Sequence, residues 1–122
     1  MKIFLIDDNT IDLLISRKLL LKYDETLNIK EFGSASQAVK ALRDNPHNLP
    51  DLILLDLNMP GMNGWDFLEA IRDLQHPPGQ VFILTSSLDE RDRSMATKYP
   101  VVRGYITKPL NNMSISQVLN QL

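Results

Sequence analysis

The 122 residues are enough for one folded domain with a substantial core and too few for two. A net charge of -2 provides no broad cationic surface, which argues against direct binding of nucleic acid, and the absence of cysteine excludes disulfides, thiolate catalysis and cysteine-based metal sites. No apolar stretch approaches the roughly 20 residues of a membrane-spanning helix. We therefore expect a single cytoplasmic domain over residues 1–122 that is not inserted in a membrane.

Short apolar runs alternate with helical patterns along the first half of the chain. The run at 3–6 is followed by a helical pattern over 10–23. The run at 28–32 is more polar, which predicts an edge strand, and a helix of small residues follows over 36–44. Continuous apolar runs, unlike alternating ones, are typical of parallel strands that helices cover on both faces.

The same alternation continues through the second half. Strands and the helices that follow them are predicted at 52–55 and 67–74, 81–84 and 89–98, and 101–106 and 112–122. The helix at 89–98 is rich in charge and poor in large apolar residues, so we expect it to be the most weakly held. Five strand–helix units predict an α/β fold, namely a doubly wound parallel sheet with helices on both faces.

Polar side chains stand at the points where four of the five predicted strands end. They are Asp7 and Asp8, Asp56, Thr85 and Lys108. In a parallel sheet the carboxyl ends of the strands meet at one edge, and ligands bind there, at the point where the strand order reverses. We therefore expect these side chains to converge on one site.

The chemistry of these side chains indicates a phosphoryl site. Crowded carboxylates repel one another, and the natural compensator is a hard divalent cation such as Mg²⁺, which prefers oxygen ligands. That cation, the ammonium of Lys108 and the hydroxyl of Thr85 would form a cradle for a tetrahedral dianion. An Asp carboxylate can form an acyl phosphate when such cations neutralise the transferring group. Asp56, central in the sheet, is the predicted nucleophile.

The same residues carry a family resemblance over essentially the whole chain. They are the pair Asp7-Asp8, Asp56 followed by Met59-Pro60-Gly61-Met62-Asn63-Gly64, Thr85 with its small neighbour Ser86, and Lys108-Pro109. The chain resembles the receiver domain of two-component response regulators, in the form of a stand-alone domain similar to chemotaxis regulators. The resemblance implies a flavodoxin-like (βα)5 domain whose five-stranded parallel sheet has the order 2-1-3-4-5.

The resemblance also implies how the phosphoryl group and the metal are held. Asp56 would be the phosphoacceptor, taking the group from a sensor histidine kinase or a His-containing phosphotransfer protein. Asp8 would bind Mg²⁺ directly and Asp7 largely through water. The side chain of Asp56 and the backbone carbonyl of Asn58 would complete the protein ligands.

Three further residues would contact the phosphoryl group or respond to it. Thr85 would hydrogen-bond its oxygens, and Lys108 would form an ion pair with them. Tyr105 would be an aromatic switch whose ring turns inward as Thr85 is drawn to the phosphate. The alternative is that Tyr105 is an ordinary aromatic residue of the strand with no role in switching. The domain would catalyse only its own phosphorylation and dephosphorylation, and it would alter the face made by its fourth helix, fifth strand and fifth helix.

Partner contacts are expected on two surfaces. A downstream protein target would bind the altered face. Regulators that dimerise through this face use complementary charges on it. The last helix here carries no charged side chain, so we expect a monomer. The apolar helix at 10–23 either makes a broad core contact or docks a phosphotransfer helix bundle through Leu13 and Leu14. His47 and His76, beside prolines, are expected to be solvated loop residues.

Two rival functions remain open at this point. A phosphatase of the haloacid dehalogenase-like class also uses a strand-end Asp nucleophile, Mg²⁺, a hydroxyl and a lysine. That class needs a second acid two residues after the nucleophile, where this chain has Asn58. A phosphate-independent interaction module would keep the fold alone, and the intact acidic pair, Thr85 and Lys108 argue against it.

Overall fold

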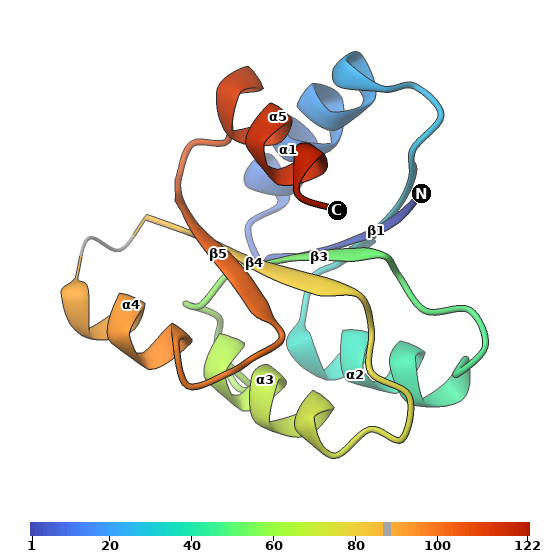
Figure 1. Ribbon diagram of the computed structural model, residues 1–122, viewed down its shortest axis with the longest axis vertical. Helices are drawn as coiled ribbons and strands as arrows, with labels where there is room; N and C mark the ends of the chain where they lie inside the picture. Colours follow the sequence, from blue (N-terminus) through green and yellow to red (C-terminus); the bar gives the residue numbers. More distant parts are fainter. Residues whose placement is uncertain (87–88) are drawn as a thin grey trace.

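A computed structural model describes residues 1–86 and 89–122 of the protein. Five parallel strands form one sheet in the order β2-β1-β3-β4-β5, with helices on both faces (Figure 1). The strands are β1 (Lys2–Ile6), β2 (Asn28–Phe32), β3 (Leu52–Leu55), β4 (Gln80–Thr85) and β5 (Val102–Thr107). The helices are α1 (Thr10–Tyr23), α2 (Ala35–Asp44), α3 (Gly64–Arg72), α4 (Glu90–Ala96) and α5 (Asn112–Asn120). The predicted doubly wound fold and its strand order, with β2 at an edge, are confirmed.

Two apolar layers enclose the sheet. α1 and α5 cover one face, and α2, α3 and α4 cover the other (Figure 1). The central strand β3 contributes to both layers, because Leu52 and Leu54 pack on the side of α1 and α5 whereas Ile53 and Leu55 pack on the opposite side. These four side chains are at most 3% exposed. Burial on both faces explains why this strand is a continuous apolar run.

α1 divides its apolar residues between the core and the surface. Leu13 and Leu20 are buried, whereas Ile11, Leu14 and Ile15 are 66%, 50% and 45% exposed. The expected core contact is therefore made by Leu13 and Leu20, whereas docking of a phosphotransfer partner on this helix stays a prediction. The inclusion of Leu13 in a docking surface was wrong, because Leu13 belongs to the core cluster between the sheet and the layer of α1 and α5.

α4 is short and has little buried surface. The Asp89 side chain caps it by accepting the backbone N–H of Arg91 (2.9 Å), so the helix starts at Glu90, one residue later than predicted. It ends at Ala96, two residues earlier than predicted, and Ala96 is the one buried residue among 90–96, all of which the structure describes. Such limited burial favours the prediction that α4 is the most weakly held helix, which stays a prediction.

Backbone hydrogen bonds bring the carboxyl ends of the strands to one edge. Ile6 on β1 pairs with Leu55 on β3, and the N–H of Asp56 donates to the carbonyl oxygen of Ile6 (2.9 Å). At the carboxyl ends of β4 and β5, the N–H of Lys108 donates to the carbonyl oxygen of Thr85 (2.7 Å). The residues that follow the strands are therefore held next to one another before any side chain interacts.

Replacing the central core residue Ile53 by alanine tests the assigned core. Ile53 is fully buried (0% exposed), so Ile53→Ala should lower the free energy of unfolding by about 2–5 kcal/mol through lost burial and a cavity. Ile11→Ala, at a site 66% exposed, should change it by less than about 0.5 kcal/mol. Urea titrations followed by circular dichroism measure both variants. Equal losses for the two would contradict this packing.

Candidate functional site

Three carboxylates gather at the carboxyl ends of β1 and β3. One oxygen atom from each of Asp7, Asp8 and Asp56 lies within 4.8 Å of the others. The side chains of Asp7 and Asp56 are both 8% exposed, whereas Asp8 is open to solvent. The structure thus brings together the three acids that the sequence pointed to, and it buries two of them.

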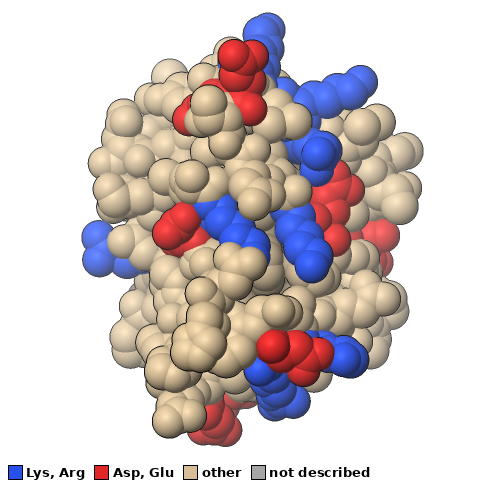
Figure 2. Space-filling model, turned by 90° about the vertical axis from the view of Figure 1, so that its right-hand side faces the viewer, with Lys and Arg blue, Asp and Glu red and all other residues tan. Residues whose placement is uncertain are grey.

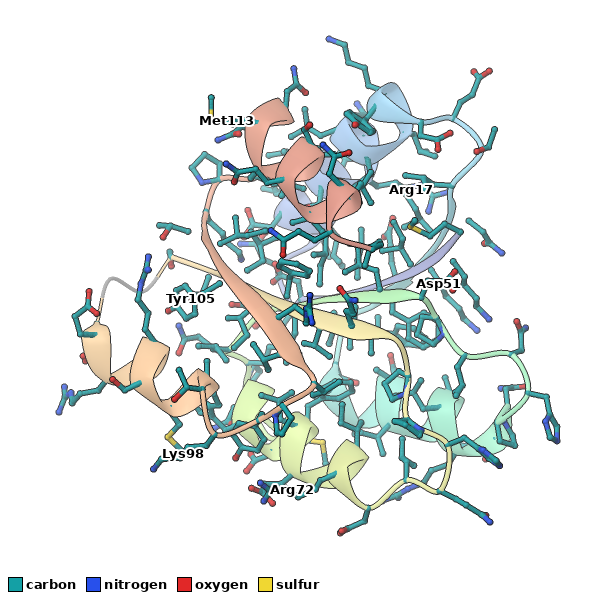
Figure 3. The ribbon with its side chains drawn as sticks, viewed as in Figure 1. Arg17, Asp51, Arg72, Lys98, Tyr105 and Met113 are labelled. Atoms are coloured by element: carbon teal, nitrogen blue, oxygen red, sulfur yellow. The ribbon has the colours of Figure 1, made fainter. Side chains whose placement is uncertain are left out.

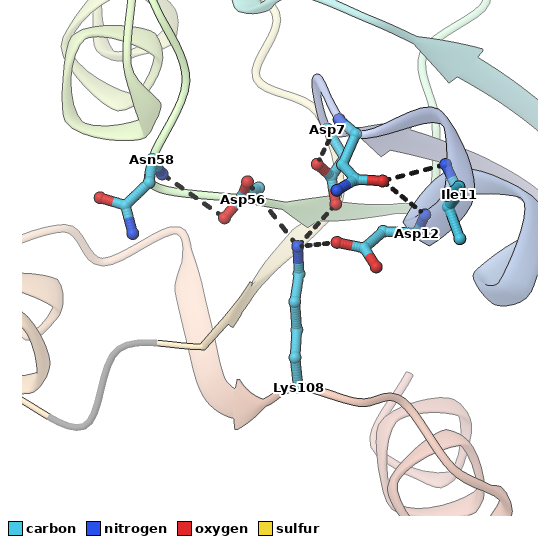
Figure 4. Close-up of polar contacts among 7 residues, drawn as sticks. Asp7, Ile11, Asp12, Asp56, Asn58 and Lys108 are labelled. Atoms are coloured by element: carbon cyan, nitrogen blue, oxygen red, sulfur yellow. Dashed lines mark hydrogen bonds and ion pairs between the residues drawn. The ribbon is translucent and has the colours of Figure 1, made fainter.

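Lys108 reaches into this carboxylate cluster from the segment after β5 (Figure 4). Its Nζ lies 2.8 Å from Asp7 Oδ2, 2.8 Å from Asp12 Oδ2 and 3.7 Å from Asp56 Oδ2. Because only 16% of the lysine side chain is exposed, these ion pairs are screened less by water than pairs on the surface. Lys108 is therefore the counter-charge for acids that come from three separate elements.

Asp12 is a site residue that was not predicted from the sequence. It lies in the first turn of α1, and its side chain is 36% exposed. A signal was present, because α1 begins directly after the loop that follows β1. The first turn of the helix therefore has to lie at the same edge of the sheet as Asp7 and Asp8. Asp12 lies within a helix and does not directly follow a strand, so the pattern of strand-end residues does not include it.

Burial changes the protonation of the cluster. The pKa of Asp56 is raised from 3.8 to about 6, chiefly by burial and then by the Asp7 carboxylate, against the opposing effect of Lys108. Burial alone lowers the pKa of Lys108, but hydrogen bonds to Asp12 and Asp7 and the charges of Asp56 and Asp7 outweigh it, so the net pKa is raised. The lysine is thus charged at neutral pH, and ionised Asp56 is held at a cost in free energy that a nearby cation would offset.

The donor atoms of the cluster suit a hard divalent cation. Asp7, Asp8 and Asp56 offer only oxygen, and no histidine or cysteine joins them within the described residues. Oxygen ligands with excess negative charge are those that Mg²⁺ binds. The N–H of Asn58 donates to Asp56 Oδ1 (3.4 Å), which keeps Asn58 beside the cluster. The residues present therefore fit the metal implied by the sequence.

The loop after Asp56 depends on glycine where α3 begins. A Cβ on Gly64 would lie 2.8 Å from the backbone oxygen of Asp56 and 2.8 Å from Cα of Leu57, which is closer than real side chains pack. The N–H of Gly64 donates to the carbonyl oxygen of Leu57 (3.0 Å). Gly61 takes a positive φ of 72° in the same loop. The loop therefore folds closely against the end of β3 and fixes the backbone on which Asp56 stands.

Thr85 and Lys108 lie at the same edge of the sheet. Thr85 ends β4 and is fully buried (0% exposed), and Ser86 beside it is exposed. The backbone N–H of Lys108 donates a hydrogen bond to the carbonyl oxygen of Thr85, and the peptide bond between Lys108 and Pro109 is cis. The predicted hydroxyl and ammonium groups thus come from adjacent strands.

Tyr105 lies in the middle of β5, opposite Ile83 of β4, on the side of the strand where α4 lies (Figure 3). The guanidinium carbon of Arg93, from α4, is 5.0 Å from the centroid of its ring, a cation–π contact. The ring is partly buried and packs against the core cluster beneath α2, α3 and α4. It thus lies between the core and the surface.

Charge is mixed over the face at the amino ends of the strands, on the right-hand side of Figure 1. Acidic and basic side chains are interspersed there among uncharged ones, with no broad field of one sign (Figure 2). His47 and His76 are exposed, as predicted, and their ring centroids lie 6.1 Å apart. None of the helices in the described part of the chain is long and apolar enough to cross a membrane.

Known proteins with similar sequences identify the family. The family described as "Response regulator receiver domain" matches residues 3–120. The chain is 34% identical over 94 residues to the nitrate/nitrite response regulator protein NarL of Escherichia coli (strain K12), an alignment that covers 77% of this chain and 43% of that protein. It is 33% identical over 91 residues to the DNA-binding transcriptional activator EvgA of the same strain, over 73% of this chain and 41% of that protein. The chain thus matches less than half the length of these two relatives.

Solved structures agree with the sequence comparison. The response regulator receiver protein from Dyadobacter fermentans DSM 18053 superposes with a TM-score of 0.87 at 32% identity, covering 99% of this chain and 96% of that chain. The family is a signalling domain, and a phosphatase of the haloacid dehalogenase-like class is not favoured. With its fold, its strand order and nearly all of its length matched, the chain belongs to the receiver domain family of two-component response regulators.

Proposed function

We propose that Asp56 accepts a phosphoryl group from a phosphohistidine donor and that this modification switches the face made by α4, β5 and α5. The position of Asp56 carries the proposal. It is a buried carboxylate whose oxygen lies within 4.8 Å of oxygens of Asp7 and Asp8 and 3.7 Å from the Lys108 ammonium. Cations at such a site stabilise the ionised nucleophile and also the charge on a transferring phosphoryl group.

Asp7, Asp8 and Asp56 would hold Mg²⁺, together with the backbone carbonyl of Asn58. The all-oxygen donor set and the excess of carboxylates over ammonium groups support this assignment. When bound, the ion supplies Lewis-acid stabilisation of phosphoryl oxygens. Exposed Asp8 is suited to direct ligation, whereas Asp7 is already engaged by Lys108, which supports a contact of Asp7 through water.

The transfer step uses one carboxylate oxygen of Asp56. That oxygen forms a bond to phosphorus while the bond from phosphorus to the donor's imidazole nitrogen breaks, and the imidazole leaves with the electron pair. Lys108 neutralises charge on the phosphoryl oxygens, and the hydroxyl of Thr85 donates a hydrogen bond to them. In hydrolysis, water forms the new bond to phosphorus, the bond to Asp56 breaks, and phosphate leaves. The domain would catalyse only these two reactions of its own side chain.

Tyr105 and α4 are placed to respond to the modification. Phosphorylation leaves roughly 1.5–2 negative charges at the site and adds strong hydrogen-bond acceptors near the end of β4. Movement of Thr85 toward them would open space along β4 and β5 beside Tyr105, whose ring now lies against Arg93. Because α4 buries only Ala96 among its residues, a small free energy is enough to shift it between arrangements.

Two surfaces would serve the partners. The donor, a sensor histidine kinase or a His-containing phosphotransfer protein, would dock on the exposed apolar residues Ile11, Leu14 and Ile15, close to the site. A downstream protein target would read the face of α4, β5 and α5. We propose that the chain acts as one receiver domain over residues 1–122, in the cytoplasm, as a monomer and without direct contact to nucleic acid; the uncharged α5 supports the monomer.

Replacing Asp56 by asparagine should abolish phosphorylation. Incubated with acetyl phosphate and Mg²⁺, the wild-type protein should gain one phosphoryl group, and Asp56→Asn should gain none, because an amide is not a nucleophile for this transfer. Asp51→Asn, at the exposed amino end of the same strand, should behave as wild type. Intact-protein mass spectrometry measures the phosphoryl groups gained by the wild type and by both variants. Labelling of Asp56→Asn at the wild-type level would contradict the assignment.

The raised pKa of Asp56 should make the free energy of unfolding depend on pH when EDTA keeps the protein free of metal. The pKa of Asp56 is about 6 in the folded protein and 3.8 in the unfolded chain. Between pH 3.8 and about pH 6 the folded state therefore binds a proton that the unfolded state has lost. The free energy of unfolding should therefore fall by up to about 3 kcal/mol as the pH rises from about 4 to about 6. Asp56→Asn removes this loss and should be the more stable protein near pH 7.

Urea titrations of wild type and Asp56→Asn across this range measure the contribution of Asp56 together with its coupling to Asp7 and Lys108, because groups that do not interact with Asp56 cancel in the difference. The stability difference should grow with pH and level off above about pH 6. Added Mg²⁺ should stabilise the wild type and have little effect on Asp56→Asn, which lacks one of the three carboxylates. A stability difference that stays constant with pH would show that burial does not raise the pKa of Asp56.

A further inference from the structure

We propose that Asp12 is a positioning residue that holds the Lys108 ammonium away from Asp56 and thereby limits the rate at which Asp56 is phosphorylated. This inference rests on the proposed role of Asp56. In the unphosphorylated protein the Lys108 Nζ lies 2.8 Å from Asp12 Oδ2 and 3.7 Å from Asp56 Oδ2. The first distance is that of a charge-assisted hydrogen bond, and the second is too long for one.

The start of α1 directs Asp12 to the lysine. Asn9 caps the helix, and its side-chain oxygen accepts the N–H groups of Ile11 (3.0 Å) and Asp12 (3.1 Å). In a capping box the residue at the position of Asp12 would turn back to the N–H of the cap residue. Here the N–H of Asn9 instead donates to Asp7 Oδ1 (2.9 Å). Asp7 thus takes the place of Asp12 at the cap, and the carboxylate of Asp12 extends to Lys108.

Asp12 differs from the other carboxylate partners of Lys108 because it is outside the proposed metal site. The acids whose oxygens lie within 4.8 Å of one another are Asp7, Asp8 and Asp56. With a cation held there, the carboxylate of Asp7 would be attracted to it and would form a weaker ion pair with Lys108. Asp12 remains as the carboxylate that competes with a phosphoryl group on Asp56 for the one ammonium.

Water can reach the ion pair between Lys108 and Asp12. A hollow of about 70 Å³ lies between α1 and the segment after β5, and both Asp12 and Lys108 line it, together with Ile15 and Leu84. The Asp12 side chain is 36% exposed, so water can take over its hydrogen bonds when the ammonium leaves. Breaking this ion pair is therefore a moderate part of the barrier to phosphorylation.

Rates of phosphorylation by acetyl phosphate at saturating Mg²⁺ test this role. Asp12→Asn, which keeps the shape and removes the charge, should be phosphorylated about two- to tenfold faster than wild type. Hydrolysis of the phosphorylated protein should change less, because the ammonium already contacts the phosphoryl group in that state. Asp12→Glu, which restores the charge, should bring the rate back toward the wild-type value.

The side-chain ammonium signal of Lys108 in ¹H–¹⁵N NMR spectra is a second readout. In the unphosphorylated, metal-free protein it should shift in Asp12→Asn and not in the remote variant Asp51→Asn. If Asp12→Asn changes neither the Lys108 signal nor the rate of phosphorylation, the role of Asp12 is overturned while that of Asp56 is left intact. The same holds if Asp12→Asn slows both phosphorylation and hydrolysis. Absence of labelling in the wild type would instead reject the proposed function, and the NMR signal would still decide whether Asp12 holds the lysine.

Discussion

The ion pairs between Lys108 and the acids at the sheet edge are the interaction on which the site depends. Asp7 and Asp56 are both 8% exposed, and two carboxylates buried so closely repel each other and lose their hydration. The ammonium of Lys108 offsets part of this cost, and the remainder is visible in the raised pKa of Asp56. The fold thus holds a site with too much negative charge, which favours cations and the chemistry that cations permit.

The sheet makes this arrangement from distant parts of the chain. Asp7 and Lys108 are 101 residues apart, yet they meet because parallel strands present all their carboxyl ends at one edge. Backbone hydrogen bonds continue past the strands to Asp56 and Lys108, so the positions of the functional groups follow from the sheet itself. The helices supply the remaining parts, since α1 presents Asp12 and the start of α3 supports the loop after Asp56.

Much of the fold could be predicted because burial on both faces leaves a plain pattern, as in the continuous apolar run of β3. The five strand-end residues could be predicted for the same reason, since a strand fixes where its last residue lies. Asp12 could not be predicted from strand ends, because its role depends on the direction of a side chain at a helix start and on Asn9 bonding to Asp7. The division of α1, with Leu13 inside and Leu14 outside, required the packing of α1 and α5 against the sheet. The neighbouring positions of His47 and His76, on separate loops, have no sequence signal.

Locating the phosphoryl group in the wild-type protein tests the central claim most directly. The protein would be incubated with Mg²⁺ and a phosphorylated His-containing phosphotransfer protein, and its peptides would be sequenced by mass spectrometry under conditions that preserve acyl phosphates. We predict a single phosphoryl group, on Asp56. A phosphoryl group on Asp7, Asp8 or any hydroxyl side chain, with Asp56 unmodified, would contradict the proposed chemistry of this site.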